Sequence, residues 1–164
     1  MNFQIRALTP SDVDDYRALR LSGMLAFPEL FSTSHAEEQA VPLIRLQQRL
    51  LHTRHQRVFG AVGDDGLLGI ACLRREQIAV VHDHARIWGV YVAPEARRAG
   101  VARALMAATL AYAHSVPELA RVSLMVGEDN GAARTLYGQL GFRLAAGARA
   151  DFRGELEMLL PLRA

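Results

Sequence analysis

The sequence predicts a mixed α/β fold in which helices lie on both faces of a central sheet. Apolar residues recur at helical spacing in some stretches and alternate, as in strands, in others. The two kinds of stretch are interleaved, and turns rich in glycine or proline separate them. The chain has 164 residues without a repeat or a low-complexity linker, so we expect a single domain spanning residues 1–164.

The predicted elements follow one another in the order β-α-α-β-β-β-α-β-α-β-β. They are a strand over residues 3–8, a helix from Thr9 to about Met24, a polar connection over 31–40, a helix over 42–51, strands over 58–62, 68–73 and 85–92, a helix from Val101 to about Ser115, a strand over 122–126, a helix over 133–140, and strands over 142–145 and 156–160. An extended segment over 78–81 is expected to lengthen or follow the strand over 68–73.

Short local signals support the first half of this order. Thr9 is a typical N-cap, Pro10 fits the first helical position, and Asp12 favours the positive end of the helix dipole. The segment 63–66, Gly-Asp-Asp-Gly, is typical of a hairpin turn between two strands. Gly89 interrupts a predicted strand, where glycine is typical of a β-bulge or of a close approach by another backbone.

The second half contains two helices, each with one apolar face. The first face holds Val101, Leu105, Ala108 and Tyr112, and the second holds Ala133, Leu136, Tyr137 and Leu140. Gly141 is expected to end the second helix.

The composition excludes several classes of protein. The formal net charge is +2, and all nineteen basic residues are arginine. Without lysine the chain can form neither a Schiff base nor a Walker-type phosphate loop, and the arginines are too widely spread to indicate nucleic-acid binding. Cys72 is the only cysteine, so we expect neither an internal disulfide nor a metal site built from several thiolates. His82 and His84 flank Asp83, but no third and fourth ligands accompany them, so we expect no bound metal. No apolar run reaches the roughly 20 residues of a membrane span and no signal peptide is recognisable, so we expect a cytoplasmic protein without membrane contact.

The segment 90–102 has the composition of a phosphate-binding turn. It runs from a strand into a helix whose first residues are small, so a ligand can approach the free N–H groups of the helix. Arg97 and Arg98 add positive charge at the same place. A solvent-exposed helix start would have the same composition, so both interpretations stay open at this point.

The segment 130–142 carries a second pattern. Asn130 is a typical N-cap for the helix that follows it. Tyr137 falls on the apolar face of that helix, where a buried core aromatic is the default expectation.

Taken together, the two segments resemble the GNAT superfamily of N-acetyltransferases. The first supplies Arg97-x-x-Gly100-x-Ala102, and the second supplies Asn130-x-x-Ala133-x-x-Leu136-Tyr137-x-x-Leu140-Gly141-Phe142. The second pattern is the more specific, and the order of elements from Phe3 to Leu160 matches the fold of the family. The resemblance implies a central, mostly antiparallel sheet. It also implies an enzyme that moves the acetyl group of acetyl-CoA to a primary amine, on a small molecule or a protein, by direct attack in a ternary complex.

The resemblance assigns roles to particular residues. The family's pyrophosphate loop, its pantetheine-binding strand and its asparagine give these acetyl-CoA-binding residues: Val90, Tyr91, Val92, Arg97, Arg98, Ala99, Gly100, Val101, Ala102 and Asn130. Tyr137 corresponds to the tyrosine that protonates the departing thiolate. Cys72 has no part in this chemistry, because no covalent enzyme intermediate is needed. Whether the chain forms a homodimer stays open.

Two positions depart from the family pattern. Ala99 stands where a basic residue is common, so we expect the phosphate contacts to be redistributed. Met125 stands where some members carry a glutamate base. Four other groups could replace that base, and none is assigned: Glu29, Glu76, His84 and Glu128. A water relay or an acceptor amine of low pKa would also serve.

The acceptor side is expected to form from the two early helices, their connection and residues 145–153. Glu29, Glu37 and Glu38 could attract a cationic amine there, whereas the aromatic residues of this region are expected to pack. The alternative to an enzyme is a non-catalytic acyl-CoA-binding sensor or scaffold. The missing base favours this alternative, and Tyr137 favours catalysis.

Overall fold

The computed structural model describes residues 1–76 and 82–163 of the chain. In this part, seven strands form one sheet in the order β1-β2-β3-β4-β5-β7-β6. The strands are β1 (Phe3–Ala7), β2 (Gln56–Gly63), β3 (Gly66–Arg75), β4 (His84–Val92), β5 (Arg121–Gly127), β6 (Arg143–Leu144) and β7 (Glu155–Pro161). All neighbouring strands are antiparallel except β4 and β5, which are parallel. The mostly antiparallel mixed sheet expected from the sequence is therefore confirmed.

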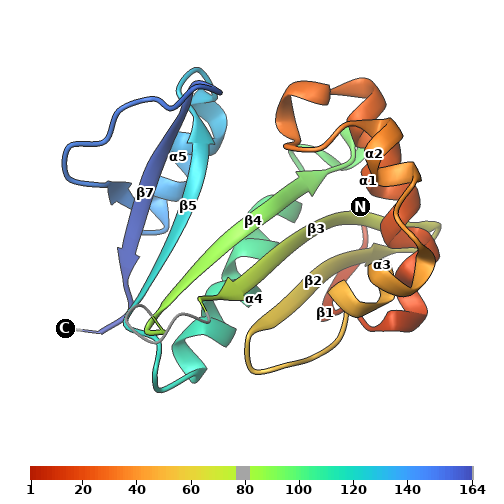
Figure 1. Cartoon of the computed structure of the whole chain (residues 1–164), viewed down its shortest axis with the longest axis horizontal. Coiled ribbons are helices and arrows are strands. Elements are labelled where there is room, and N and C mark those ends of the chain that lie inside the picture. The colour runs from red at the N-terminus through yellow and green to blue at the C-terminus, as the bar shows by residue number, and fades with distance from the viewer. Residues whose placement is uncertain (77–81, 164) are drawn as a thin grey trace.

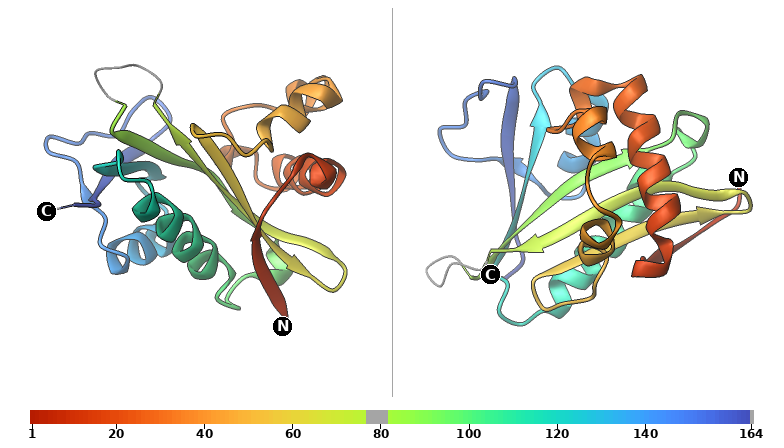
Figure 2. Two further views of the ribbon diagram at one scale, coloured as in Figure 1. Left: turned by 90° about the horizontal axis from the view of Figure 1, so that it is seen from below. Right: turned by 45° about the vertical axis from the view of Figure 1, so that its right-hand side comes forward.

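Helices cover both faces of the sheet, as predicted. The helices α1 (Val13–Ala26), α2 (His35–Gln39) and α3 (Leu43–Arg49) lie on one face, and α4 (Val101–Ser115) and α5 (Gly131–Gln139) lie on the other (Figure 1, Figure 2). Tyr16 of α1 and Leu46 of α3 pack with Ile70 of β3 in one apolar cluster. On the opposite face, Met106 of α4 packs with Leu124 of β5 in another. The helices α1–α3 thus cover strands β2–β4 on one face, and α4 and α5 cover the other face.

The connection predicted over residues 31–40 contains a helix, α2. The Ser34 hydroxyl caps this helix by accepting a hydrogen bond from the Glu37 N–H at 3.1 Å. Serine followed three residues later by glutamate is a recognised capping signal, which the high polarity of the segment obscured.

The buried face of α4 holds partly different residues from the predicted face, which consisted of Val101, Leu105, Ala108 and Tyr112. It holds Val101, Leu105, Met106, Thr109, Leu110 and Ala113. Ala108 and Tyr112 are only half-buried, and the guanidinium of Arg57 lies 4.5 Å from the Tyr112 ring. The helix contacts two apolar clusters at once, so its buried stripe is broader than a single row of apolar side chains.

The remaining predicted strands occur with small shifts at their ends. The strand predicted over 142–145 is shortened to β6, because Phe142 turns into the core and is fully buried there. The extended segment predicted over 78–81 lies outside the described residues.

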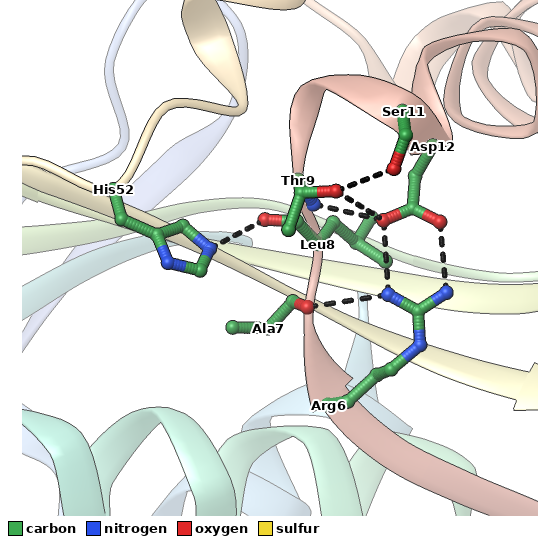
Figure 3. Close-up of polar contacts among 7 residues, drawn as sticks. All are labelled: Arg6, Ala7, Leu8, Thr9, Ser11, Asp12 and His52. Carbon is green, nitrogen blue, oxygen red and sulfur yellow. Dashed lines mark hydrogen bonds and ion pairs between the residues drawn. The ribbon is translucent and has the colours of Figure 1, made fainter.

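Polar contacts fix the junction between β1 and α1 (Figure 3). The Thr9 N–H donates to Asp12 Oδ2 at 2.8 Å, and Arg6 donates to both Asp12 carboxylate oxygens at 2.8 and 2.9 Å. These hydrogen bonds, first among them the one from Arg6, lower the pKa of Asp12 to about 2. His52 Nε2 lies 2.7 Å from the Leu8 carbonyl oxygen. The helix start predicted at Thr9 is therefore confirmed, and its first turn is a 3₁₀ turn.

Gly89 forms the predicted bulge in β4. Its φ is +63°, and the β3–β4 register shifts so that Gly89 and Val90 together lie opposite Ala71. β4 pairs with β5 only at its beginning, where residues 84–86 lie beside residues 121–123. Beyond these pairs the two strands diverge (Figure 1). We call the region between the diverging strands the β4–β5 opening.

Candidate functional site

The turn between β4 and α4 contains two residues in the left-handed region. Arg98 has a φ of +62°, and Gly100, the N-cap of α4, has a φ of +81°. This conformation is free of steric cost at Gly100, whereas at Arg98 it costs roughly 1–2 kcal/mol. Turns with such dihedrals point several main-chain N–H groups to the same side, which is the arrangement of an anion-binding nest.

The main-chain amides of this turn have no acceptor in the described part of the protein. The first helical hydrogen bond of α4 runs from the Ala104 N–H to the Gly100 carbonyl at 3.0 Å, and the N–H groups of residues 98–103 make none. A Cβ atom at Gly100 would meet no atom within 4 Å. Unpaired donors thus lie at the positive end of a helix, and the space on the Cβ side of Gly100 is open. This arrangement fits the oxygens of a phosphate or diphosphate.

The two arginines of the turn have different surroundings. Arg97 Nε donates to the Val92 carbonyl at 3.2 Å, and its guanidinium lies 4.5 Å from the Phe27 ring. Arg97 therefore fastens the turn to β4 and to the end of α1. The exposed Arg98 side chain has no partner among residues 1–76 and 82–163. Of these two guanidinium groups, that of Arg98 is the one available to an anion.

After the bulge, β4 turns main-chain groups toward the β4–β5 opening. The Ala93 N–H donates to the Leu68 carbonyl of β3 at 2.8 Å. Because the main-chain groups of successive strand residues point to alternate sides, those of Val92 point away from β3. The contact of Arg97 with the Val92 carbonyl confirms this direction.

The side chains of residues 90–92 alternate between the two faces of the sheet. Val90 and Val92 pack on the α4 side. Tyr91 is 3% exposed and packs on the α1 side, where its ring centroid lies 5.4 Å from that of Phe31. A ligand in the opening would thus meet the main chain of β4 rather than the Tyr91 ring.

Asn130 is the N-cap of α5, as predicted. Its Oδ1 accepts a hydrogen bond from the Ala133 N–H at 3.2 Å, and its own N–H donates to the Gly127 carbonyl at 2.9 Å. The capping bond uses the oxygen of the side chain, which leaves the amide NH₂ as a donor for a ligand.

Tyr137 of α5 shares an apolar cluster with both strands that flank the opening. It is 7% exposed and belongs to the same apolar cluster as Ile87 of β4 and Val126 of β5. Its ring centroid lies 6.1 Å from that of Phe142. Burial raises the pKa of Tyr137 to about 12, so the hydroxyl is protonated at neutral pH. The predicted core position is confirmed, and a protonated hydroxyl can act as a donor.

The acetyltransferase (GNAT) family matches residues 24–142 of the chain. The chain belongs to this family. It is therefore an acetyltransferase, an enzyme of the acyltransferase class. No curated protein sequence matches it.

Solved structures show the same fold. A probable acetyltransferase from Staphylococcus epidermidis is 22% identical, with a TM-score of 0.75 over 98% of this chain and 99% of the other. The PaiA N-acetyltransferase from Thermoplasma acidophilum, in complex with coenzyme A, is 18% identical, with a TM-score of 0.68 over 98% and 99%. The ribosomal-protein-S18-alanine N-acetyltransferase from Escherichia coli is 18% identical, with a TM-score of 0.71 over 99% and 96%.

The four substitutes considered for the GNAT glutamate base do not gather at the bulge. Glu29 and Glu128 are exposed in connections outside the helices α1–α5 and the strands. Glu76 and His84 meet where β3 ends and β4 begins, and the Glu76 N–H donates to the His84 carbonyl at 2.9 Å. His84 Nε2 lies 2.7 Å from Ser123 Oγ, and its pKa is lowered, chiefly by burial. The imidazole is thus neutral at neutral pH, five residues before Gly89.

Sequence analysis did not identify Glu157, which lies beside the position of the GNAT glutamate. It pairs directly with Met125 in the β5–β7 register. Its neighbours Leu156 and Met158 are buried in the core on the α4–α5 side, so the half-buried Glu157 lies on the opposite face. The alternation in Leu156-Glu157-Met158 indicates that Glu157 lies on the other face of the strand from Leu156 and Met158. Only the strand pairing shows that Met125 is its neighbour on β5.

One expectation for the acceptor side of this GNAT protein is wrong. Glu38 is 1% exposed and forms ion pairs with Arg20 and Arg49, the latter at 3.0 Å. Burial alone would raise the pKa of Glu38, but the two guanidinium groups hold it below its ordinary value. Its charge is therefore neutralised within the protein and cannot attract a cationic amine.

Arg153 Nη2 donates to the Phe31 carbonyl at 2.8 Å, so the segment 145–153 meets the connection between α1 and α2, as expected. Phe31 packs on Tyr91, as expected for an aromatic residue of this region. The same expectation is wrong for Phe152, which is 97% exposed. Burial raises the pKa of the Cys72 thiol to about 12, which keeps it protonated and unreactive.

Within residues 1–76 and 82–163, no three side chains of His, Cys, Asp or Glu come together in a way that could hold a metal ion. None of the helices in this part of the chain has the length and apolar character needed to cross a bilayer.

Proposed function

We propose that this acetyltransferase moves the acetyl group of acetyl-CoA to a primary amine by direct attack in a ternary complex. The observation that carries the proposal is the run of unpaired amides at residues 98–103 beside the open space at Gly100. The fold shared with the PaiA protein in complex with coenzyme A supports it. The fold shared with an enzyme named for acetylating an alanine supports an amine acceptor.

The residues at the turn would bind the nucleotide end of acetyl-CoA. Free main-chain amides between Arg98 and Ala102 donate to the diphosphate, and the Arg98 guanidinium neutralises part of its charge. The Arg97 N–H already donates to the Pro94 carbonyl, so Arg97 holds the turn in place. The main chain of residues 90–92 aligns the pantetheine arm along β4, and the Asn130 amide donates to the same arm. These contacts direct the acetyl group to the bulge at Gly89, where β4 has left β5.

Two groups would assist the chemical step. Main-chain N–H groups of β4 stabilise the negative charge that develops on the acetyl oxygen. The hydroxyl of Tyr137 donates a hydrogen bond to the departing sulfur. The pKa of Tyr137, about 12, lies above the value of about 8.5 that is ordinary for a thiol. Tyr137 therefore stabilises the thiolate chiefly by this hydrogen bond. A complete transfer of its proton to the sulfur requires that the tyrosine oxygen takes up another proton, from water, at the same time.

Glu157 is our candidate for the group that accepts the proton of the amine, directly or through water. It faces away from the core beside Met125, where the family's glutamate would stand. A carboxylate at this place can accept a proton from an amine that approaches the opening between β4 and β5.

The test combines binding with turnover. Isothermal titration calorimetry with acetyl-CoA measures binding, and release of free thiol in the presence of a panel of amines measures transfer. We expect both heat of binding and acceptor-dependent thiol release. Binding without thiol release for any acceptor would instead favour the sensor or scaffold, and absence of binding would contradict both functions.

A further inference from the structure

A cavity of about 460 Å³ lies beneath α3, on the face of the sheet that α1, α2 and α3 cover. This volume suits a small organic molecule. Its polar lining consists mainly of arginine and glutamine side chains, and Trp88 of β4 forms part of its wall. The residues that matter here are Arg45, Gln48, Arg49, Gln56, Arg74 and Trp88.

The cavity carries more positive charge than the described residues neutralise. Three guanidinium groups line it, those of Arg45, Arg49 and Arg74, and no aspartate or glutamate among residues 1–76 and 82–163 does. Arg49 shares the buried Glu38 carboxylate with Arg20. The side chains of Arg45 and Arg74 have neither an ion pair nor a hydrogen bond within the described residues. Because like charges repel in a partly enclosed space, an anion in the cavity would be stabilised there.

A continuous set of contacts joins the cavity to the bulge. Trp88 precedes Gly89 in β4 and also lines the cavity. Arg49 is linked through Glu38 to Arg20, whose Nη1 lies 3.6 Å from the place that a Cβ of Gly89 would take. The Arg20 guanidinium lies 5.9 Å from the centre of the Trp88 ring. The cavity therefore lies next to the bulge, where the proposed function directs the acetyl group, and Trp88 and Arg20 stand between the two.

We propose that the cavity binds an oxyanion, a carboxylate or a phosphate, that the amine acceptor itself carries. This inference rests on the proposed function and defines the acceptor as an amine with an acidic group, such as an α-amino acid. Guanidinium groups match both kinds of oxyanion, with two parallel hydrogen bonds each. A polyamine without an acidic group would bring further positive charge to the same arginines and is therefore disfavoured.

The experiment compares matched acceptors in the thiol-release assay at saturating acetyl-CoA. Each α-amino acid of a panel is paired with its α-amide, and O-phosphoethanolamine is paired with ethanolamine. The amine of an α-amide is less basic and more often neutral, so a preference for the acid cannot arise from amine reactivity. Fluorescence of Trp88, the sole tryptophan, reports binding of the same compounds without turnover.

We expect the acidic member of at least one pair to have a kcat/KM about tenfold or more higher, as for a charge-assisted hydrogen bond. The first set of pairs identifies a carboxylate, and the second identifies a phosphate. The double variant Arg45→Gln/Arg74→Gln should bring this ratio close to one. Arg54→Gln is the matched control, because Arg54 is exposed and does not line the cavity.

Equal kcat/KM values within every pair would overturn the inference and leave the proposed function intact. Acetyl-CoA binding without thiol release from any acceptor would instead overturn the proposed function. In that case the Trp88 titration still decides about the cavity. Tighter binding of the acidic compounds, lost in the double variant, supports the oxyanion site, and equal or no binding of acid and amide refutes it.

Discussion

The turn that opens α4 and the cavity beneath α3 are built from different atoms of the chain. At the turn, the free donors are main-chain N–H groups from one continuous segment, residues 98–103. In the cavity, the donors are side chains that come from α3, β2 and β3. The first region depends on a backbone conformation, and the second depends on which residues meet across the fold.

This difference explains why the two regions tolerate change differently. A main-chain site keeps its donors whatever side chains it carries, so Ala99 can stand where a basic residue is common. A side-chain site changes its specificity with each substitution, because every guanidinium removed takes its charge with it. We therefore expect the turn that opens α4 to be sensitive at Gly100 and the cavity beneath α3 to be sensitive at its arginines.

The largest expected effect separates the two regions. Gly100→Glu places a carboxylate and a bulky side chain in the open space before the amides, and it strains a φ of +81°. Acetyl-CoA affinity should fall by about 10³-fold, or about 4 kcal/mol, in calorimetry. The response of Trp88 fluorescence to acidic acceptors should persist. Gly100→Ala is the control for strain without charge, and an unchanged affinity in Gly100→Glu would mean that the turn does not bind the diphosphate.

A smaller effect is expected for Tyr137, which we propose to contact the departing CoA thiolate and which belongs to neither region. Tyr137→Phe removes the hydroxyl but keeps the ring that packs with Phe142. We expect kcat to fall by about 10²-fold, typical for loss of a positioned donor, with the acetyl-CoA Kd nearly unchanged. Equal kcat in the variant, measured by thiol release, would remove Tyr137 from the chemical step.

The candidate proton acceptor, Glu157, belongs to neither region and lies on β7, next to β5 in the sheet. Glu157→Gln keeps the size of the side chain but removes its basicity. We expect kcat to fall by about tenfold near neutral pH, with a steeper dependence on hydroxide, because the amine must then lose its proton to the solvent. Glu155→Gln is a matched control on the same strand. If both variants show the same pH–rate profile as the parent enzyme, Glu157 is not the proton acceptor.

The smallest effect belongs to a polar cluster that serves neither region. Asp12 has a pKa lowered to about 2 from an ordinary 3.8, so its carboxylate stabilises the folded state above about pH 4 and this contribution is lost as the pH falls toward 2. Asp12→Asn should lower the free energy of unfolding by about 1 kcal/mol at neutral pH, mostly through the helix cap, since Arg6 is largely exposed. In thermal melts at pH 7, the parent should have a higher Tm than the variant. At pH 2, where the Asp12 contribution is lost, the two Tm values should become similar. A variant as stable as the parent at pH 7 would show that the cluster contributes nothing.

Local sequence signals predicted most of the elements because they act within a few residues. The glycine-aspartate hairpin, the Gly89 bulge and the Asn130 cap each depend on the conformational preferences of one short segment, and all three occur as expected. Local signals gave a wrong prediction where the polarity or apolar spacing of a segment pointed away from the structure that it forms. The polarity of residues 31–40 masked the Ser34 cap of α2, and the apolar row chosen for α4 missed Met106 and Thr109.

The sequence by itself determined the order of the elements, the strand-to-helix turn within residues 90–102 and the place of Tyr137 in an apolar helix face. Each follows from the spacing of neighbouring residues, which the local backbone converts directly into shape. Only the tertiary structure decided that Glu38 is neutralised by Arg20 and Arg49, that Glu157 stands beside Met125, and that Arg45 and Arg74 share a cavity. Those contacts join residues far apart in the chain, and their electrostatics depend on distances that only the packed sheet and helices set.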